Sequence, residues 1–557
     1  MKSRIFRYMV YYMLFLAGTG LVCSLGSCFY FRIDLTEDQR YSIHPATQKL
    51  LSELEEELHI EVYLTGDLPT GLKQLKRATQ ELLEECNVYA QRQLHYEFID
   101  LNKVPATHKK SCLRKLAAKG IQPTNLYIQE KGRRIEKLIF PSALMTYRGQ
   151  EGGVLLLKGN KMANPAQMIN QSMEGLEYEL ASTLEKLVRT QRRQVALLRG
   201  HSEPDLSQLS GLIKALEERY MLHIVDFSAR STLGAYDVLL ITKPQHSFSE
   251  TEKYLLDQYI MKGGKVLFFL DSLRINMESL SRQEAFAFPL HIGLDDQLFR
   301  YGVRINPDLV QDLRSGVYPV VVGNLGNQPQ LKLLPWNFFP ILNHFSDHLV
   351  TKNMDVLYPQ FVSSMDMIQV QGVIHTPLIF TSRHSRRLEA PVHVNLEALR
   401  KPPQPANYNH GHIPLAYLLE GTFTSLYKNR FLPEGFDRST FLPESQPTKL
   451  LVCASGNIVL NSLEPRKKQP LPWGYDPFLQ QHFANQDFVC NTLAYVLNEE
   501  GLINLKNKTL KIRLLDQVKL DQERRWWQLM NLVVPLLLLG LLGAVWNYLY
   551  KRIYTRW

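Results

Sequence analysis

Two uncharged, apolar stretches stand at opposite ends of this 557-residue sequence, and they constrain its fold more than any other feature. Residues 8–31 contain no charged side chain, and neither do residues 526–550. Each stretch is long enough to cross a hydrocarbon core of roughly 30 Å as a helix that rises about 1.5 Å per residue. We therefore predict two membrane-spanning helices that flank a large polar body.

Aromatic side chains mark the ends of both stretches, as they do at membrane–water interfaces. The residues we expect to act as membrane anchors are Tyr8, Tyr11, Tyr12 and Tyr30 in the first stretch and Trp526, Trp527 and Trp546 in the second. Their positions support the interpretation of both stretches as membrane spans.

Lysine and arginine near the spans predict their orientation, because cytoplasmic flanks carry an excess of these residues. Lys2, Arg4 and Arg7 precede the first stretch, and Lys551, Arg552 and Arg556 follow the second. We expect both termini in the cytoplasm and residues 32–525 outside it. As an alternative, Leu25-Gly-Ser-Cys28 is typical of a lipoprotein cleavage site, which would leave a lipid on Cys28.

The charge and cysteine content exclude several classes of protein. The chain has 64 Lys and Arg residues against 54 Asp and Glu residues, a net charge of +10. These basic residues are scattered, so we interpret the charge as an ordinary solvated surface and expect no nucleic-acid partner. Six cysteines are too few for a disulfide-dense scaffold. The sequence has no Gly-x-x-x-x-Gly-Lys-Ser/Thr motif, so any ATP would bind to another subunit.

The first part of the polar body predicts a small α/β domain. We expect a helix that Ser42 caps and that runs to about Glu57, and a helix near residues 107–118. Apolar and β-branched runs predict strands at 59–64, 94–99 and 125–129. Strands that alternate with helices favour a thioredoxin-like arrangement. Because the domain lacks Cys-x-x-Cys, we expect no redox chemistry.

The sequence that follows the small domain predicts a larger, doubly wound α/β domain with a parallel sheet. Its expected strands are 194–199, 222–227, 236–242, 265–271 and a late strand at 449–453. Ser249 and Glu252 have the spacing of a capping box at the start of a helix to Lys262. The predicted boundaries are 1–31 (tail and span), 32–160 (small domain), 161–192 (connecting helix), 193–300 (central domain), 301–448 (irregular elaboration), 449–525 (return to the central domain) and 526–557 (span and tail).

Ligands of open parallel sheets bind beyond the carboxyl ends of the strands, so we sought candidate residues in the loops that follow them. The candidates for ligand or partner binding are His201 and Glu203 after the first central strand, and Ser455 and Asn457 after the late strand. Two interpretations of His201 and Glu203 stay open. In the favoured one they cap and brace their loop; in the other they bind a ligand.

No catalytic constellation emerges from the sequence. Gly-x-Ser-x-Gly and His-Glu-x-x-His are both absent, and no partner histidine can be assigned to Cys453. His410 and His412 have no identifiable third metal ligand. We therefore expect no enzymatic activity, cofactor or metal.

Several stretches in order along the chain resemble the GldG family, the gliding-motility auxiliary proteins of ABC transporters in Bacteroidetes. Among them are Arg40-Tyr-Ser42, Val62-Tyr-Leu-Thr-Gly-Asp67, Gly200-His-Ser-Glu203, Leu256-Asp-Gln-Tyr-Ile-Met-Lys-Gly-Gly-Lys265 and Leu471-Pro-Trp-Gly-Tyr-Asp476. Each motif is weak alone, but their order covers nearly the whole body and both spans.

This resemblance implies a membrane-anchored, non-catalytic subunit that works with a polytopic permease and a cytoplasmic ATPase in gliding or associated secretion. It implies a central domain similar to class I glutamine amidotransferases without their catalytic machinery. The chain departs from the family at Ser455-Gly-Asn457, where the family loop is acidic. The alternatives are a solute-binding protein with a cleft between its two α/β units and a membrane-anchored amidotransferase-like hydrolase.

Overall fold

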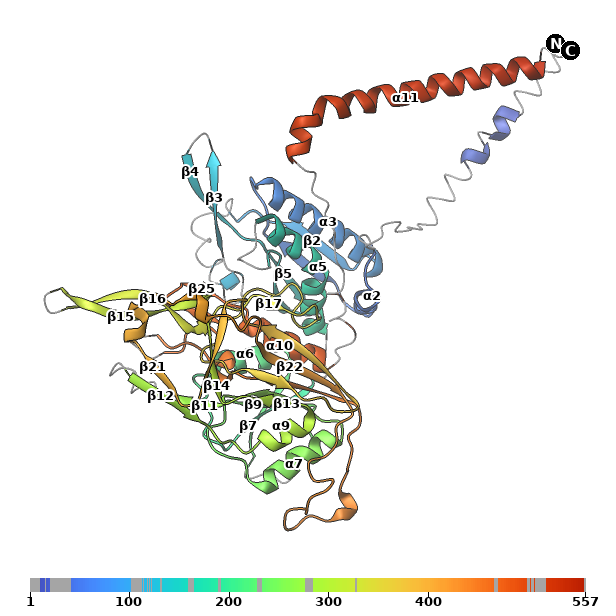
Figure 1. Ribbon diagram of the computed structural model, residues 1–557. Coiled ribbons are helices and arrows are strands. Elements are labelled where there is room, and N and C mark those ends of the chain that lie inside the picture. Colours follow the sequence, from blue (N-terminus) through green and yellow to red (C-terminus); the bar gives the residue numbers. More distant parts are fainter. Residues whose placement is uncertain are drawn as a thin grey trace. The chain divides into compact units, whose positions relative to one another are not determined.

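The computed structural model describes most of the chain. The described residues are 11–15, 17–20, 42–101, 113, 115–117, 119, 121, 123–130, 133–158, 165–188, 192–227, 233–275, 284–325, 328–464, 469–497, 501, 505 and 517–554. They fall into two compact units, Met1–Thr509 and Leu510–Trp557. The fold is mixed α/β with several sheets (Figure 1).

A four-stranded sheet forms the core of the first α/β region. Its strands are β1 (Leu58–Val62), β2 (Leu94–Phe98), β5 (Ser142–Tyr147) and β6 (Gln150–Leu155), in the order β2-β1-β5-β6. β1 is parallel to β2 and antiparallel to β5. The helices of this region are α2 (Pro45–Ser52), α3 (Thr70–Tyr89) and α5 (Pro165–Val188). Alternate β1 residues Leu58, Ile60 and Val62 are buried, as the period of a strand requires.

Two details of this region differ from the sequence prediction. The first helix begins at Pro45, and His44 caps it by accepting a hydrogen bond from the Ala46 amide, so Ser42 is not the cap; the helix ends at Ser52 rather than near Glu57. Proline suits the first helical position because its missing N–H needs no partner there. The strand predicted at 125–129 is β3 (Thr124–Glu130), which pairs with β4 (Arg133–Ile139) as a separate hairpin. Most of the helix predicted near 107–118 lies outside the described residues.

An eight-stranded mixed sheet forms the central region. Its five parallel strands are β7 (Gln194–Arg199), β8 (Met221–Asp226), β9 (Val238–Thr242), β10 (Lys265–Phe269) and β23 (Thr448–Cys453). They match the five predicted strands. Three antiparallel strands extend the edge beside β23: β22 (Pro414–Gly421), β19 (Val373–Phe380) and β17 (His344–Phe345). Residues 301–448, predicted to be an irregular elaboration, thus supply part of the main sheet.

Helices cover both faces of this sheet. They are α6 (Ser210–Glu217) and α10 (Asn485–Val496) on one face, and α7 (Glu250–Met261) and α9 (Asp295–Tyr301) on the other. Along β7, Val195 and Leu197 pack into the first apolar cluster, while Ala196 and Leu198 pack into the second. Two-sided burial explains why the parallel strands are continuous apolar runs.

A third apolar cluster, built on Trp336, Phe338, Phe339 and Phe361, lies beside the sheet. The smaller strands are β11 (Leu273–Ile275), β12 (Glu284–Pro289), β13 (Val303–Ile305), β14 (Asp308–Asp312), β15 (Ser315–Leu325), β16 (Gln328–Pro340), β18 (Met365–Met367), β20 (Ser385–Glu389), β21 (Val392–Asn395), β24 (Tyr475–Asp476) and β25 (Gln481–His482). Four 3-10 turns span Glu397–Arg400, Pro405–Asn407, Arg438–Thr440 and Gly456–Val459. Figure 1 shows the long β15–β16 hairpin extending from this part of the molecule.

A buried carboxylate ties α7 and α9 to the segment after β22. Asp257 is fully buried on α7 and accepts hydrogen bonds from the Tyr301 hydroxyl, the Ser425 hydroxyl and the Leu426 amide at 2.8, 2.6 and 3.0 Å. Burial raises the pKa of this carboxyl, against the effect of those hydrogen bonds. The contacts hold the segment from Leu426 onward close to α9.

The second unit contains α11 (Gln517–Tyr554). Trp526–Arg552 is long and apolar enough to cross a membrane and is unburied, as expected for the second predicted span. The predicted anchors Trp526, Trp527 and Trp546 are all exposed on this helix, and their role in the membrane stays a prediction. In the first predicted span, the described residues 11–15 and 17–20 are helical and exposed, Tyr11 and Tyr12 among them. Tyr8 and Tyr30 lie outside the described residues, so that span stays a prediction.

Candidate functional site

The carboxyl ends of the parallel strands meet at one edge of the central sheet. β7 lies between β8 and β9, so the order of the strands reverses direction there, which is where open α/β sheets bind ligands. The loop after β7 contains Gly200 and Ser202 with positive φ angles of 126° and 56°. The loop after β9 begins with Lys243, whose φ is 52°. These turns bring polar side chains to the predicted edge.

His201 is held between two carboxylates. Its imidazole Nε2 lies 3.3 Å from Glu252 Oε2, and its Nδ1 lies 3.7 Å from Glu203 Oε1. The ring stacks on Phe248, with 3.7 Å between ring centroids. His201 is only 4% exposed. The site therefore encloses the histidine rather than presenting it to solvent.

The two carboxylates favour the charged imidazolium. Burial alone would lower the pKa of His201, but interactions with Glu203 and Glu252 outweigh burial and raise it above the ordinary value of 6.5. Burial would raise the pKa of both carboxyls, yet hydrogen bonds and the histidine lower them. The three side chains form a charged cluster in which each ionised group stabilises its neighbour.

Backbone bonds lock the same loop. Glu203 Oε2 accepts from the Gly200 and His201 amides at 3.1 and 3.0 Å. The His201 carbonyl accepts from the Gln245 and His246 amides of the loop after β9. Glu252 also completes the predicted capping box, because its carboxylate accepts from the Ser249 amide and its backbone amide donates to the Ser249 hydroxyl. This geometry favours the bracing interpretation of His201 and Glu203; a ligand-binding role for them stays a prediction.

A second polar cluster lies where β9, β10 and β23 end. Lys243 Nζ is 3.1 Å from Asp271 Oδ2 and donates a short hydrogen bond to Asn457 Oδ1. Asp271 Oδ1 accepts from the Gly456 amide at 2.6 Å. Ser455 Oγ and Asn457 Nδ2 both donate to the Gln360 carbonyl. Asn457 therefore contributes a neutral amide that bonds to a lysine, and any binding role of Ser455 and Asn457 stays a prediction.

The other sequence candidates do not join these clusters. Cys453 is buried at the end of β23, and burial raises the pKa of its thiol to about 12, which disfavours the thiolate. His412 Nδ1 contacts the Thr381 carbonyl at 2.9 Å, while His410 is exposed. Within the described residues, no group of three or more metal-binding side chains is found.

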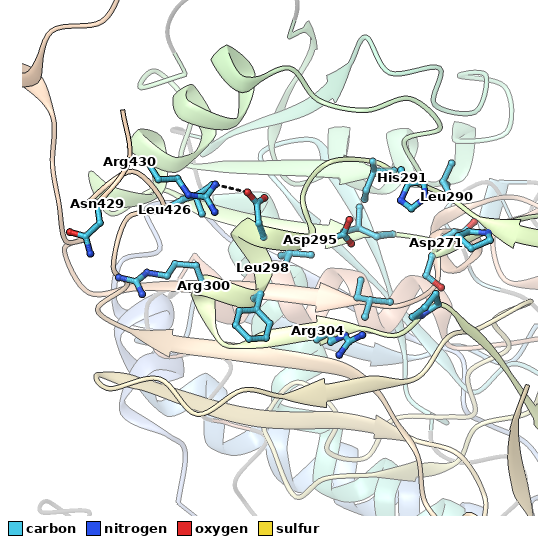
Figure 2. Close-up of a pocket in the computed structure, with 18 residues that line it drawn as sticks. Asp271, Leu290, His291, Asp295, Leu298, Arg300, Arg304, Leu426, Asn429 and Arg430 are labelled. Carbon is cyan, nitrogen blue, oxygen red and sulfur yellow. Dashed lines mark hydrogen bonds and ion pairs between the residues drawn. The ribbon is translucent and has the colours of Figure 1, made fainter. Parts of the chain in front are cut away.

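A cavity of about 680 Å³ opens beside the second cluster (Figure 2). Asp271 at the end of β10 lines one part, and α9 and β13 line another. The loop residues Leu426, Asn429 and Arg430 complete it. Figure 2 shows Asp271 and His291 toward one end, and Arg300, Asn429 and Arg430 toward the other.

Sequence reasoning missed several residues of this edge. The sequence predicts Glu252 as the capping-box partner of Ser249. Its contact with His201 joins the start of α7 to a loop that is 51 residues away along the chain, and no local sequence pattern predicts that these segments meet. Asp271 is the last residue of the strand predicted at 265–271, so a search at the carboxyl ends of the strands could also have selected it. Arg300 is the last residue of the predicted first part of the central domain, and Arg304 belongs to the region predicted as elaboration. No motif distinguishes either of them from other surface arginines.

The alternative of a solute cleft between the two α/β units concerns the place where these units meet, which includes an ion pair. Lys158 Nζ is 2.9 Å from Glu179 and 3.2 Å from Asp487, which joins α5 to α10. The cavity beside this ion pair measures about 30 Å³, roughly the volume of one water molecule. At this ion pair the two units are closely packed, and the solute-binding alternative stays a prediction.

Comparisons with known proteins identify the class. Residues 192–492 match the family described as "ABC-type uncharacterized transport system", and residues 37–146 match a domain of unknown function (DUF7088). The first match covers more than half of the chain and all five parallel strands. The chain therefore belongs to this ABC transport system family and has an auxiliary role in transport.

Individual relatives add little detail. An uncharacterized protein of Borreliella burgdorferi (strain ATCC 35210 / DSM 4680 / CIP 102532 / B31) is 22% identical over 436 residues, which cover 74% of this chain and 76% of that protein. A solved structure described as "mmIFT52 N-terminal domain" is 12% identical with a TM-score of 0.30, covering 57% of this chain and 100% of that one. That structural likeness is too low to support an argument.

Proposed function

We propose that this chain is a non-catalytic, membrane-anchored subunit that acts with a separate permease and a separate cytoplasmic ATPase. The observation that carries the proposal is the family match over residues 192–492 in a chain that also has the membrane-compatible helix Trp526–Arg552. A helix of this kind can pack against the helices of a permease within the membrane.

The polar groups at the carboxyl edge support a structural role rather than catalysis. His201 is enclosed by Glu203, Glu252 and Phe248, and the Lys243 ammonium is bonded to Asp271 and Asn457. A general base or nucleophile must reach its substrate. These groups instead bond to one another, which suits a rigid body that transmits conformational change.

The proposed setting is the bacterial inner membrane, with both termini in the cytoplasm and the body in the periplasm. The basic flanks of the two predicted spans support this orientation. Gliding or associated secretion is the process that the GldG-like motifs favour. The GldG-like fold, including its amidotransferase-like central domain, is part of the same proposal.

Affinity purification of the full chain from its native membranes in mild detergent tests the proposal. We expect a polytopic permease and an ATPase to be recovered with it. The matched control is a chain in which residues 526–550 are replaced by a polyleucine span, which keeps a membrane anchor but removes the specific helix surface. Equal recovery of both proteins with this control would place the contact outside the helix. Recovery of neither protein with the native chain would refute the proposed function.

A further inference from the structure

The β15–β16 hairpin extends from the body of the molecule and is called the arm below (Figure 1). Its residues, 315–340, include a single charged side chain, that of Lys332. An extended hairpin exposes much of its surface to water, and natural proteins usually place charged side chains on such strands. The low charge of the arm therefore calls for an explanation.

The register of the two strands places the apolar side chains on one face of the arm. Residues paired across an antiparallel hairpin lie on the same face, and successive pairs alternate between the two faces. The pairs on one face are Val317–Pro335, Pro319–Leu333 and Val321–Leu331. The pairs on the other face are Tyr318–Leu334 and Val320–Lys332. The first face, called the apolar face below, thus carries no charge, and Lys332 lies on the opposite face.

The apolar face is exposed to solvent. Leu331 is 62% exposed, and Val321 and Leu333 are each 46% exposed. On the opposite face Val320 is buried, and the ring of Tyr318 lies 4.4 Å from the ring of Trp336 between centroids. Strands with one solvated face normally direct polar side chains to water. An exposed, contiguous apolar face indicates a binding surface.

The chemistry of this face favours lipid over protein as its partner. Its valine, leucine and proline side chains have no hydrogen-bond donor or acceptor. Protein–protein interfaces carry about one hydrogen bond per 100–200 Å², and these bonds fix the register of the partners. The boundary between lipid head groups and acyl chains requires only apolar side chains that can be buried in it.

The length of the chain between the body and α11 also favours lipid. Leu505 is buried in the first unit, and α11 begins at Gln517. Residues 506–516 join them and can span at most about 40 Å when fully extended. In a membrane crossed by α11, this tether keeps the body at a high effective concentration beside the lipid surface.

We propose that the apolar face of the arm enters the head-group boundary of the membrane that α11 crosses, as a second contact between this chain and lipid. The inference rests on the proposed function, because α11 must anchor the chain in a membrane. It adds a contact that orients the body on the membrane surface, since a single helix followed by a flexible tether would leave the body free to rotate.

Quenching by brominated lipids tests the inference on the full chain, reconstituted into vesicles of phosphatidylcholine and phosphatidylglycerol. A small fluorescent amino acid, excited at wavelengths that tryptophan does not absorb, is placed at Leu331 or Leu333 on the apolar face. The matched control has the same group at Lys332 on the opposite face, and a second control has it at Arg77, an exposed residue of α3. Each sample is compared in vesicles with and without bromine on the acyl chains near the head groups, and flotation measures how much chain the vesicles hold.

We expect brominated lipids to reduce the emission at positions 331 and 333 at least about twofold, because an interfacial element reaches about 5–10 Å into the bilayer. Emission at position 332 should fall much less, and emission at position 77 should stay unchanged. Leu333→Asp places a charge on the apolar face and should abolish the quenching at position 331, whereas Leu333→Ile should preserve it. Leu333 is exposed, and thermal unfolding checks that both variants are folded.

The outcomes separate the inference from the proposed function. A chain that does not float with the vesicles refutes the membrane anchor and with it the inference. A chain that floats but shows no quenching at positions 331 and 333 refutes the inference alone. Equal quenching at position 332 would exclude a special role for the apolar face. Emission at position 331 that depends on the number of copies per vesicle, but not on bromine, would assign the face to a second copy and overturn the inference.

Discussion

The contact between His201 and Glu252 predicts a pH-dependent effect of the substitution Glu252→Gln. This change removes one of the two carboxylates beside the buried imidazole but keeps an oxygen that can accept from the Ser249 amide. At an effective dielectric constant of about 20, unit charges separated by 3.3 Å attract each other by about 5 kcal/mol. Desolvation of the two charges offsets much of this attraction, so we expect Glu252→Gln to lower the free energy of opening of this loop by about 2 kcal/mol.

The sign of the pH dependence follows from the raised pKa of His201. Stabilisation by the imidazolium is fully present below the unfolded pKa, near 6.5, and is lost as the pH rises through the raised folded value. The free energy of opening of this loop in the variant should therefore fall by about 2 kcal/mol at about pH 6, and by progressively less as the pH is raised toward about pH 9.

Hydrogen–deuterium exchange of a peptide that covers residues 199–205 measures this effect. The Gly200 and His201 amides both donate to Glu203, so their exchange reports opening of the loop. A loss of about 2 kcal/mol corresponds to roughly thirtyfold faster exchange at about pH 6 after correction for intrinsic rates. Glu217→Gln, an exposed change on α6, is the control. Equal acceleration at both pH values, or none at about pH 6, would refute the charged-cluster interpretation.

Three further predictions concern other parts of the fold. Gly456→Ala places a Cβ atom 2.6 Å from Lys243 Cβ, so the free energy of unfolding should fall by about 1–3 kcal/mol and the midpoint of thermal unfolding should fall with it. An unchanged midpoint would contradict the packing described. Asp257→Asn replaces an accepting oxygen with an NH₂ group, which faces groups that themselves donate, so the free energy of unfolding should fall by about 2–4 kcal/mol. The segment after β22 should then become sensitive to limited proteolysis. A chain without residues 1–31 should sediment with membranes through α11, whereas a chain that also lacks 510–557 should not; fractionation of both checks this.

The parallel core was predictable from sequence because its strands are buried on both faces. β9, whose five residues are all buried, has the apolar run Val238–Ile241 followed by Thr242, and Lys243 comes directly after the strand. The capping box of α7 was likewise predictable, since Ser249 and Glu252 are local partners. Predicting such features needs only the spacing of apolar residues within one helix or strand and the residues that begin or end it.

Features that depend on distant partners were not predictable. β22 is also largely buried, but its antiparallel pairing with β23 and β19 depends on contacts across a long connection. β3 carries an ordinary strand pattern, yet it pairs with its neighbour β4 rather than joining the sheet of β1. The cavity is lined by Arg300, Arg304 and Leu426 from different segments of the chain, and no spacing in the sequence specifies that these segments enclose one space.

ATP hydrolysis by the reconstituted transporter tests the central claim most directly, because an auxiliary subunit should alter an activity that it does not itself possess. The measurement compares liposomes that contain the purified permease and ATPase with and without this chain, at equal amounts of ATPase. We predict no hydrolysis by this chain alone and a changed rate when it is added to the other two subunits. An unchanged rate in the assembled complex, or hydrolysis by this chain alone, would contradict the account.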